Sequence, residues 1–268
     1  GSIYYLPIPD LMQILLFYLL LLFFTFQIKL DFKQKTINIA FISFFIIFAA
    51  ITAKHFSNNT LKIMFFDIKG VESALITTKD KKNIFISTLN QDKLKYNPAN
   101  SIIIPYFRDK GIYKIDEFIT LNYDDSSNSK DYITYILENV KISNIYINNQ
   151  NKTNELVKLL FKYQNNLKTK YLYNNQIINP SKYLKITVLN ISDSPYLHIT
   201  SDNFSGLIVT KYNNNLFFKT QKKLKSPLKL IKILNNKQST LELQRFIKPE
   251  TAIITNKLIK NFNNSRIY

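Results

Sequence analysis

Two neighbouring aspartates, Asp124 and Asp125, follow an apolar run at residues 117–121 and precede a helix-like pattern. Together with Asp131 they offer carboxylate oxygens, which Mg²⁺ or Mn²⁺ prefers as ligands in hydrolytic sites. Aspartate is also favoured in turns and at the amino ends of helices, where its carboxylate accepts backbone N–H groups. We favour this structural role for Asp124 and Asp125.

Histidine, cysteine and glycine are scarce, which restricts the chemistry of a single chain. There are two histidines, His55 and His198, and no cysteine, so neither a site with several imidazole ligands nor a thiolate site can be built. His198 alternates with Leu197 and Ile199 in a strand-like run. No partner for a general base stands out, and we expect a structural role. With four glycines, no glycine-rich phosphate loop can be written, and nucleotide-driven chemistry is not expected.

The chain is strongly basic, with a formal net charge of +18. Residues 1–54 carry a net charge of +2, so +16 lies after residue 54. Such a charge attracts nucleic acid or anionic lipid. Six lysines crowd one stretch beside Tyr212 and Phe218, where lysines would meet phosphates of single-stranded DNA and rings would stack on bases. These lysines are Lys219, Lys222, Lys223, Lys225, Lys229 and Lys232. The alternative is a solvated loop enriched in lysine by the codon usage of an AT-rich genome.

Two apolar segments precede the basic part. No charged residue occurs in residues 11–28 or in residues 37–53, and each segment has about the length that a helix needs to cross a bilayer core. We therefore predict two transmembrane helices. No basic residue precedes the first segment and no typical cleavage site precedes the second, which argues against a secretory signal. A buried hairpin of a water-soluble protein is the alternative.

The loop between the predicted spans sets their expected orientation. It carries Lys29, Lys33 and Lys35 against a single aspartate, and the positive-inside rule places it in the cytoplasm. We expect residues 1–56 to form a transmembrane hairpin in the cytoplasmic membrane. Residues 57–268 would then form a domain on its outer side.

Short apolar runs separated by polar turns follow the spans, as in proteins rich in β-strands. Strands are predicted at 61–66, 73–78, 83–88, 117–121, 143–147, 184–189, 196–200, 206–210, 215–220, 228–234 and 251–255. Helical spacing appears at 132–140, 156–161 and 241–247, and a short helix is expected between Pro105 and Gly111. The Asn-rich residues 171–176 are expected to form a surface loop. This order indicates an α+β domain with αββα layers.

Three segments resemble the C-terminal part of the ComEC family of DNA-uptake channel proteins. Residues 61–88 resemble the strand, turn and strand with which that domain opens. Residues 101–125, SIIIPYFRDKGIYKIDEFITLNYDD, are the most distinctive. They are similar to a family pattern of apolar-P-Y-L-R-x-x-G-I-x-x-L-D, followed by a strand and the metal loop H-x-D-x-D-H. Residues 228–255 resemble the segment with the family's paired histidines. The resemblance implies a metallo-β-lactamase fold, which in intact members carries a two-metal hydrolase site.

On this resemblance, most metal ligands of the family are replaced. The ligand positions of the metal loop and of the paired histidines fall on Asn122, Asp124, Ser126, Ser127, Asn235 and Asn236. Only Asp124 keeps the chemistry of a metal ligand. We therefore expect a degenerate site with no metal and no other cofactor, in which Asp124 is a vestige.

Positions that support the family's site differ as well. Lys69 and Val71 stand where the family has glycines, which allow tight turning and close approach of the backbone. The third strand ends in Ser87 and Leu89 in place of aspartate and glycine. A later carboxylate of the family falls near residues 220–221, where this chain has threonine and glutamine.

The function implied by the resemblance is that of a membrane-anchored part of a competence protein. It would assist transport of single-stranded DNA across the cytoplasmic membrane, together with other DNA-uptake proteins and with a catalytically inactive C-terminal domain. We expect the chain to be part of a longer channel. One alternative is a divergent metal-dependent hydrolase or nuclease that uses carboxylates around Asp124. The other is a membrane-tethered interaction protein unrelated to DNA uptake.

Overall fold

The computed structural model describes residues 14, 18, 60–68, 71–89, 96–122, 127–148, 154–163, 167–190, 195–210, 224, 228–233 and 251–254. The predicted spans at 11–28 and 37–53 lie outside these ranges, apart from Ile14 and Tyr18, which are helical. Within the described ranges, no helix has the length and apolar character needed to span a bilayer.

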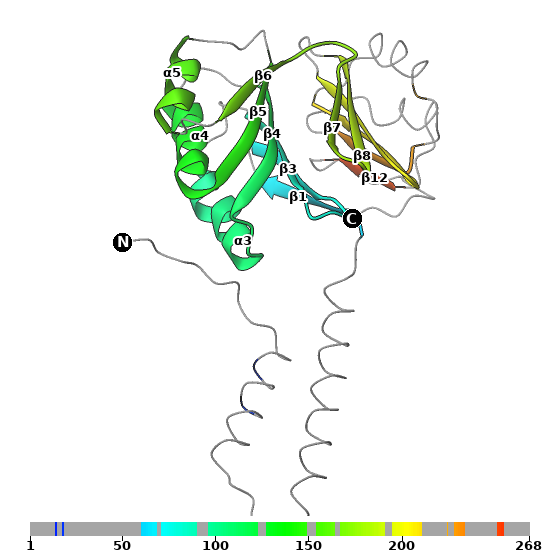
Figure 1. Ribbon diagram of the computed structural model, residues 1–268, viewed down its shortest axis with the longest axis horizontal. Coiled ribbons are helices and arrows are strands. Elements are labelled where there is room, and N and C mark those ends of the chain that lie inside the picture. Colours follow the sequence, from blue (N-terminus) through cyan, green and yellow to red (C-terminus); the bar gives the residue numbers. More distant parts are fainter. Residues whose placement is uncertain are drawn as a thin grey trace, which may run out of the picture.

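The first half of the described chain builds one sheet with helices on one face (Figure 1). Its strands lie in sequence order: β1 (Lys62–Ile68), β2 (Val71–Thr77), β3 (Asn83–Leu89), β4 (Lys114–Asn122), β5 (Lys141–Asn148) and β6 (Lys168–Leu172). β1, β2 and β3 pair antiparallel, whereas β3, β4, β5 and β6 pair parallel. The connections between the parallel strands carry the helical turn η2 (Ala99–Ile103) and the helices α3 (Ile104–Asp109), α4 (Ser127–Asn139) and α5 (Asn154–Tyr163).

A second sheet packs on the face of the first that the helices leave uncovered (Figure 1). It contains β7 (Ile177–Ser181), β8 (Leu184–Asn190), β9 (Tyr196–Ser201), β10 (Phe204–Val209), β11 (Leu230–Ile233) and β12 (Thr251–Ile254), again in sequence order. The strands from β7 to β10 pair antiparallel, and β11 and β12 continue the sheet in parallel.

Two hydrophobic cores hold these layers together. One lies between the helices and the first sheet and includes Phe85, Phe107, Phe118 and Tyr132. The other lies between the two sheets and consists mainly of isoleucine, leucine and valine. In β3 and β4, successive side chains alternate between the two cores, because neighbours on a strand point to opposite faces.

Phe85 is the centre of the aromatic packing in the helix-side core. Its ring centroid lies 5.3 Å from that of Phe107 in an edge-to-face contact and 5.3 Å from that of Phe118. Phe66 contacts it at 6.3 Å. Aromatic pairs in these arrangements stabilise a fold beyond their buried area. The cluster therefore joins α3 to three strands of the first sheet.

The α+β sandwich predicted from the sequence is confirmed, and so are most of its elements. Ten predicted strands and the helices at 132–140, 156–161 and 105–111 are present with shifts of a few residues at their ends. Gly111 ends the last of these with φ 65°, a conformation that glycine adopts without strain. The predicted strand at 215–220 and helix at 241–247 lie outside the described residues, and the domain boundary at residue 57 stays a prediction.

The prediction of a surface loop at residues 171–176 is wrong in part, because Tyr171 and Leu172 belong to β6. Neither β6 nor β7 was expected, since both are edge strands with a weak apolar pattern. β6 has exposed lysines at alternate positions, and β7 contains Pro180, which a strand tolerates at a sheet edge.

Candidate functional site

The carboxyl ends of β3 and β4 meet where the resemblance places the family's metal loop. The two strands are parallel neighbours, and Thr88 pairs with Asn122 after a register shift that follows Ser87. Loops at the carboxyl ends of parallel strands are common positions for functional residues. The side chains at this edge therefore decide whether a metal could be held.

Ser87, which by the resemblance replaces a family aspartate, is covered by a tyrosine from α4. Its Oγ lies 2.9 Å from the hydroxyl of Tyr132, and both residues are buried. Burial raises the pKa of the Tyr132 phenol, while the hydrogen bond with Ser87 opposes the shift. The phenol thus stays neutral near pH 7, and the pair offers no negatively charged ligand.

Hydroxyl groups also occupy the neighbouring positions on this face of the sheet. Ser73 of β2 and Thr120 of β4 pair in register with Ser87 on either side. Thr120 Oγ1 donates to the carbonyl of Tyr146 at 3.2 Å, and Ser73 Oγ is buried with no hydrogen-bond partner among the described residues. Neutral hydroxyls are poor ligands for Zn²⁺, which prefers thiolate, imidazole and carboxylate groups. Val71, which by the resemblance replaces a family glycine, is buried in the helix-side core.

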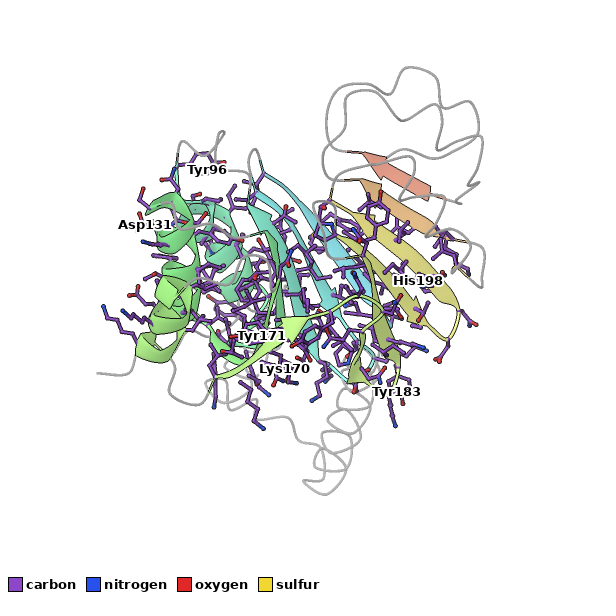
Figure 2. All side chains as sticks on the ribbon, turned by 90° about the horizontal axis from the view of Figure 1, so that it is seen from above. Tyr96, Asp131, Lys170, Tyr171, Tyr183 and His198 are labelled. Carbon is purple, nitrogen blue, oxygen red and sulfur yellow. The ribbon has the colours of Figure 1, made fainter. Side chains whose placement is uncertain are left out.

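Of the three predicted carboxylates, the structure describes Asp131, which does not lie with a described histidine. Asp131 is exposed in the first turns of α4, and its carbonyl accepts a hydrogen bond from Asn97 Nδ2. His198 lies in the second sheet on the opposite side of the molecule (Figure 2). Within the ranges that the structure describes, no three His, Asp or Glu side chains form a group able to hold a metal.

Several predicted positions are not described. Asp124, Asp125, Ser126, Asn235, Asn236, His55, Lys69 and residues 220–221 lie outside the described ranges. Ser127, the last position of the metal loop, is the exposed first residue of α4. The expectation that Asp124 holds a turn before this helix therefore stays a prediction.

His198 has a partner that the sequence did not single out. Its Nε2 lies 3.0 Å from Ser205 Oγ on β10, and both side chains are buried. Burial lowers the pKa of the His198 imidazole, and the positive charge of Lys185 lowers it further. No carboxylate among the described residues hydrogen-bonds the imidazole to orient it as a general base, so a structural role fits the geometry.

The predicted lysine track is described only at its end. Lys229 is exposed, and its backbone N–H donates to the carbonyl of Ser205 at 2.8 Å. Lys232 lies in β11 beside Ile208 of β10. The other four lysines of the track lie outside the described residues, so its course as a continuous surface stays a prediction.

A buried carboxyl group that sequence analysis missed lies near the start of β4. Asn144 Nδ2 donates to Glu117 Oε1 at 3.1 Å, whereas Oε2 is buried without a hydrogen-bond partner among the described atoms. Lys170 donates to the Tyr146 hydroxyl at 3.2 Å and lies over the tyrosine ring. Burial raises the pKa of the Glu117 carboxyl, while the charge of Lys170, the nearby Tyr146 hydroxyl and the hydrogen bond from Asn144 act against this shift.

The raised pKa of Glu117 predicts that its ionisation destabilises the fold. Protonated Glu117 favours the folded state, so its contribution is fully present below the ordinary pKa of 4.5 and is lost as the pH rises through the higher pKa of the folded state. We expect Glu117→Gln to raise the free energy of unfolding at pH 7 by roughly 1 kcal/mol. Urea unfolding at several pH values measures this change.

The free energy of unfolding of Glu117→Gln should also change less with pH above 4.5 than that of the unmodified protein. Glu138→Gln, which changes an exposed carboxyl on α4, serves as the control and should leave stability within about 0.5 kcal/mol. Equal pH dependence in the protein and in Glu117→Gln would show that Glu117 does not titrate abnormally.

Comparison with protein-family models and with curated proteins gives no match to this chain. Among solved structures, the chain is similar to the zinc-bound PqqB of Methylobacterium extorquens, with 8% sequence identity and a TM-score of 0.48 over 69% of this chain and 74% of that one. It is also similar to the metallo-β-lactamase fold protein YhfI of Bacillus subtilis, with 13% identity and a TM-score of 0.49 over 73% of this chain and 86% of that one. These likenesses concern the arrangement of strands and helices.

Proposed function

We propose that the chain acts in the cytoplasmic membrane as part of a ComEC-like competence protein and assists passage of single-stranded DNA. In this proposal, residues 57–268 form a metallo-β-lactamase-like domain on the outer side of the membrane. The domain binds or supports the transported strand without cutting it. Other DNA-uptake proteins supply the strand.

The observation that carries the proposed loss of catalysis is the pairing of Ser87 with Tyr132. A buried hydroxyl pair fills the place where intact members of the resembled family carry an aspartate. A metal-activated water needs negative or imidazole ligands to hold the cation. The neutral row formed by Ser73, Ser87 and Thr120 supplies none of these.

Charge and the apolar segments support the other parts of the proposal. The uncharged runs at 11–28 and 37–53 have the composition of membrane spans. The lysine track has the charge needed to contact phosphates, and Lys229 at its end is exposed. Membrane anchorage and DNA contact can be tested separately, because they rest on different residues.

The test is binding of a fluorescent single-stranded oligonucleotide to the full chain in a nonionic detergent. If all six track lysines contact phosphates, the salt slope is about −4, at about 0.7 per contact. Affinity should then fall by roughly two to three orders of magnitude between 50 and 200 mM salt. Fluorescence anisotropy at increasing salt measures the slope.

Charge reversal distinguishes a local track from the general charge of the protein. Lys222→Glu with Lys223→Glu should weaken binding and reduce the slope by roughly 1.4. The control, Lys62→Glu with Lys158→Glu, changes the net charge equally at exposed positions of β1 and α5 and should have a smaller effect. Absence of binding at low salt would favour an interaction protein unrelated to DNA. Metal-dependent cleavage that is lost in Asp124→Ala would favour the hydrolase alternative.

A further inference from the structure

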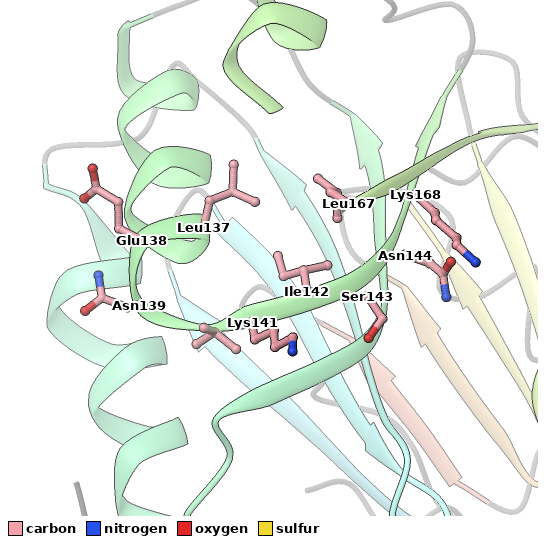
Figure 3. A pocket seen from close by; sticks show the side chains of 10 residues that line it. Leu137, Glu138, Asn139, Lys141, Ile142, Ser143, Asn144, Leu167 and Lys168 are labelled. Atoms are coloured by element: carbon pink, nitrogen blue, oxygen red, sulfur yellow. The ribbon is translucent and has the colours of Figure 1, made fainter. Parts of the chain in front are cut away.

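A pocket of about 550 Å³ lies at the amino ends of the parallel strands of the first sheet, where α4 ends and β5 and β6 begin (Figure 3). This is the end of the sheet away from Ser87 and the other hydroxyl groups described above. The pocket is open to solvent and is lined by Leu137, Glu138, Asn139, Val140, Lys141, Ile142, Ser143, Asn144, Leu167 and Lys168. None of these residues belongs to the candidate site at the carboxyl ends of β3 and β4 or to the lysine track. The pocket is therefore a separate feature of the domain.

Lysines lie at the amino ends of all four parallel strands of the sheet. Lys114, Lys141 and Lys168 are the first residues of β4, β5 and β6, and Lys82 immediately precedes β3. Since these four strands are parallel, their amino ends lie side by side at the same end of the sheet, and Lys114 pairs directly with Lys141. The strand order thus gathers four positive charges that are far apart in the sequence.

Only part of this charge is neutralised within the described structure. Asp116 pairs with Lys114 at 2.8 Å and lies 3.9 Å from Lys82. Lys141 and Lys168, the two lysines that line the pocket, are exposed and form no ion pair with a described carboxylate. Their charge is therefore available to an anion bound in the pocket.

Two carboxyl groups oppose an anion here. Glu138 is on the rim, where it is exposed to solvent and its charge is screened. Glu117 lies behind Asn144, which holds its Oε1. Because burial raises the pKa of Glu117, its negative charge is disfavoured and repels an anion less than a fully ionised carboxylate would.

One side of the pocket is apolar. Leu137 and Ile142, which are 4% and 3% exposed and belong to the helix-side core, and the partly buried Leu167 supply aliphatic side chains, while Asn144 and Lys168 lie on the other side of Ile142 from Leu137 (Figure 3). No aromatic ring is among the described lining residues. Single-stranded nucleic acid binds strongly where bases stack on aromatic rings, so the pocket lacks the platform that a base requires. An anion with an aliphatic body fits the lining better.

We propose that this pocket binds an anionic phospholipid, with its phosphate between Lys141 and Lys168 and its first aliphatic carbons against Leu137, Ile142 and Leu167. Ser143 supplies a hydroxyl that can donate to a phosphate oxygen. The inference goes beyond DNA passage and draws only on the membrane anchorage in the proposed function. Its residues differ from those of the DNA test, so either proposal can fail alone.

The experiment uses the full chain in a nonionic detergent and counts bound lipid by native mass spectrometry. Phosphatidylglycerol and phosphatidylcholine are added separately. We expect one phosphatidylglycerol to bind at least about tenfold more tightly than phosphatidylcholine, as expected for two lysines next to one phosphate with a net charge. Lys141→Gln with Lys168→Gln should remove this preference.

Lys62→Gln with Lys158→Gln is the matched control, because it removes two exposed lysines outside the pocket. Loss of the preference in the control as well would overturn the proposal. Ser143→Asp, which places a carboxylate at the rim, should weaken phosphatidylglycerol binding, and unchanged binding would contradict the assignment. Thermal unfolding of each variant shows whether it is folded.

Two competitors test the ligand class. Glycerol 3-phosphate has the headgroup chemistry without acyl chains and should displace the lipid only at concentrations at least about tenfold higher, because it covers less apolar surface. Equal competition would indicate a simple anion site and overturn the lipid assignment. Displacement by a single-stranded oligonucleotide in the protein, but not in Lys141→Gln with Lys168→Gln, would assign the pocket to nucleic acid instead.

Discussion

Phe85→Ala is expected to lower the free energy of unfolding by about 4 kcal/mol, the range found when a large aromatic side chain is removed from a packed core. Phe85 is fully buried and its ring contacts Phe66, Phe107 and Phe118. The cavity would lie between β3 and α3, which are held together by these contacts. Urea unfolding followed by circular dichroism measures the change.

The control for Phe85→Ala is Tyr173→Ala, which removes an aromatic ring that is 56% exposed in the turn after β6. This variant should stay within about 0.5 kcal/mol of the unmodified protein. If Phe85→Ala cost as little as Tyr173→Ala, the aromatic cluster would not be the centre of the helix-side core.

Tyr132→Phe should have the second largest effect, a loss of roughly 2 kcal/mol, because it leaves Ser87 Oγ buried without its partner. Ser87→Ala should cost a similar amount by leaving the phenol unpaired. The double variant should cost less than the two single variants together, since it removes both polar groups of the hydrogen bond. Chemical denaturation of all four proteins gives the coupling energy.

Tyr135→Phe on the same helix is the control for the loss of a hydroxyl, and it should change stability little because Tyr135 is only partly buried. Strict additivity of Ser87→Ala and Tyr132→Phe would mean that the two hydroxyls do not interact. The proposal of a site closed by a hydroxyl pair would then lose its main support.

The strands of the sandwich could be predicted because their apolar runs are short and regularly interrupted. β3 and β10, for example, are apolar on both faces, as expected of strands between two covered layers. β6 could not be found in this way. Lys168 and Lys170 face solvent at the sheet edge, so the apolar pattern of β6 is weak. β6 is a strand because it pairs with β5 on one side.

In the candidate site, the sequence carried information at a single position. Ser87 stood out because the resembled family has a carboxylate there. Tyr132, which lies 45 residues further along the chain, appeared in the sequence only as one apolar position of a helix stripe. The proposed lipid pocket was likewise hidden, because β5 and β6 pair in parallel and only this pairing lets Lys141 and Lys168 line one pocket, although Lys168 itself pairs with Asn144.

The strand order has a consequence for how the chain folds during synthesis. Every strand of the first sheet precedes every strand of the second, so β1 to β6 can pair before β7 is made. The helix-side core can form at that stage, but Ile76, Ile84 and Ile119 stay exposed until the second sheet covers them. Exposed apolar surface on a half-made sheet favours aggregation. This intermediate is the stage at which a chaperone would be of most use to the protein.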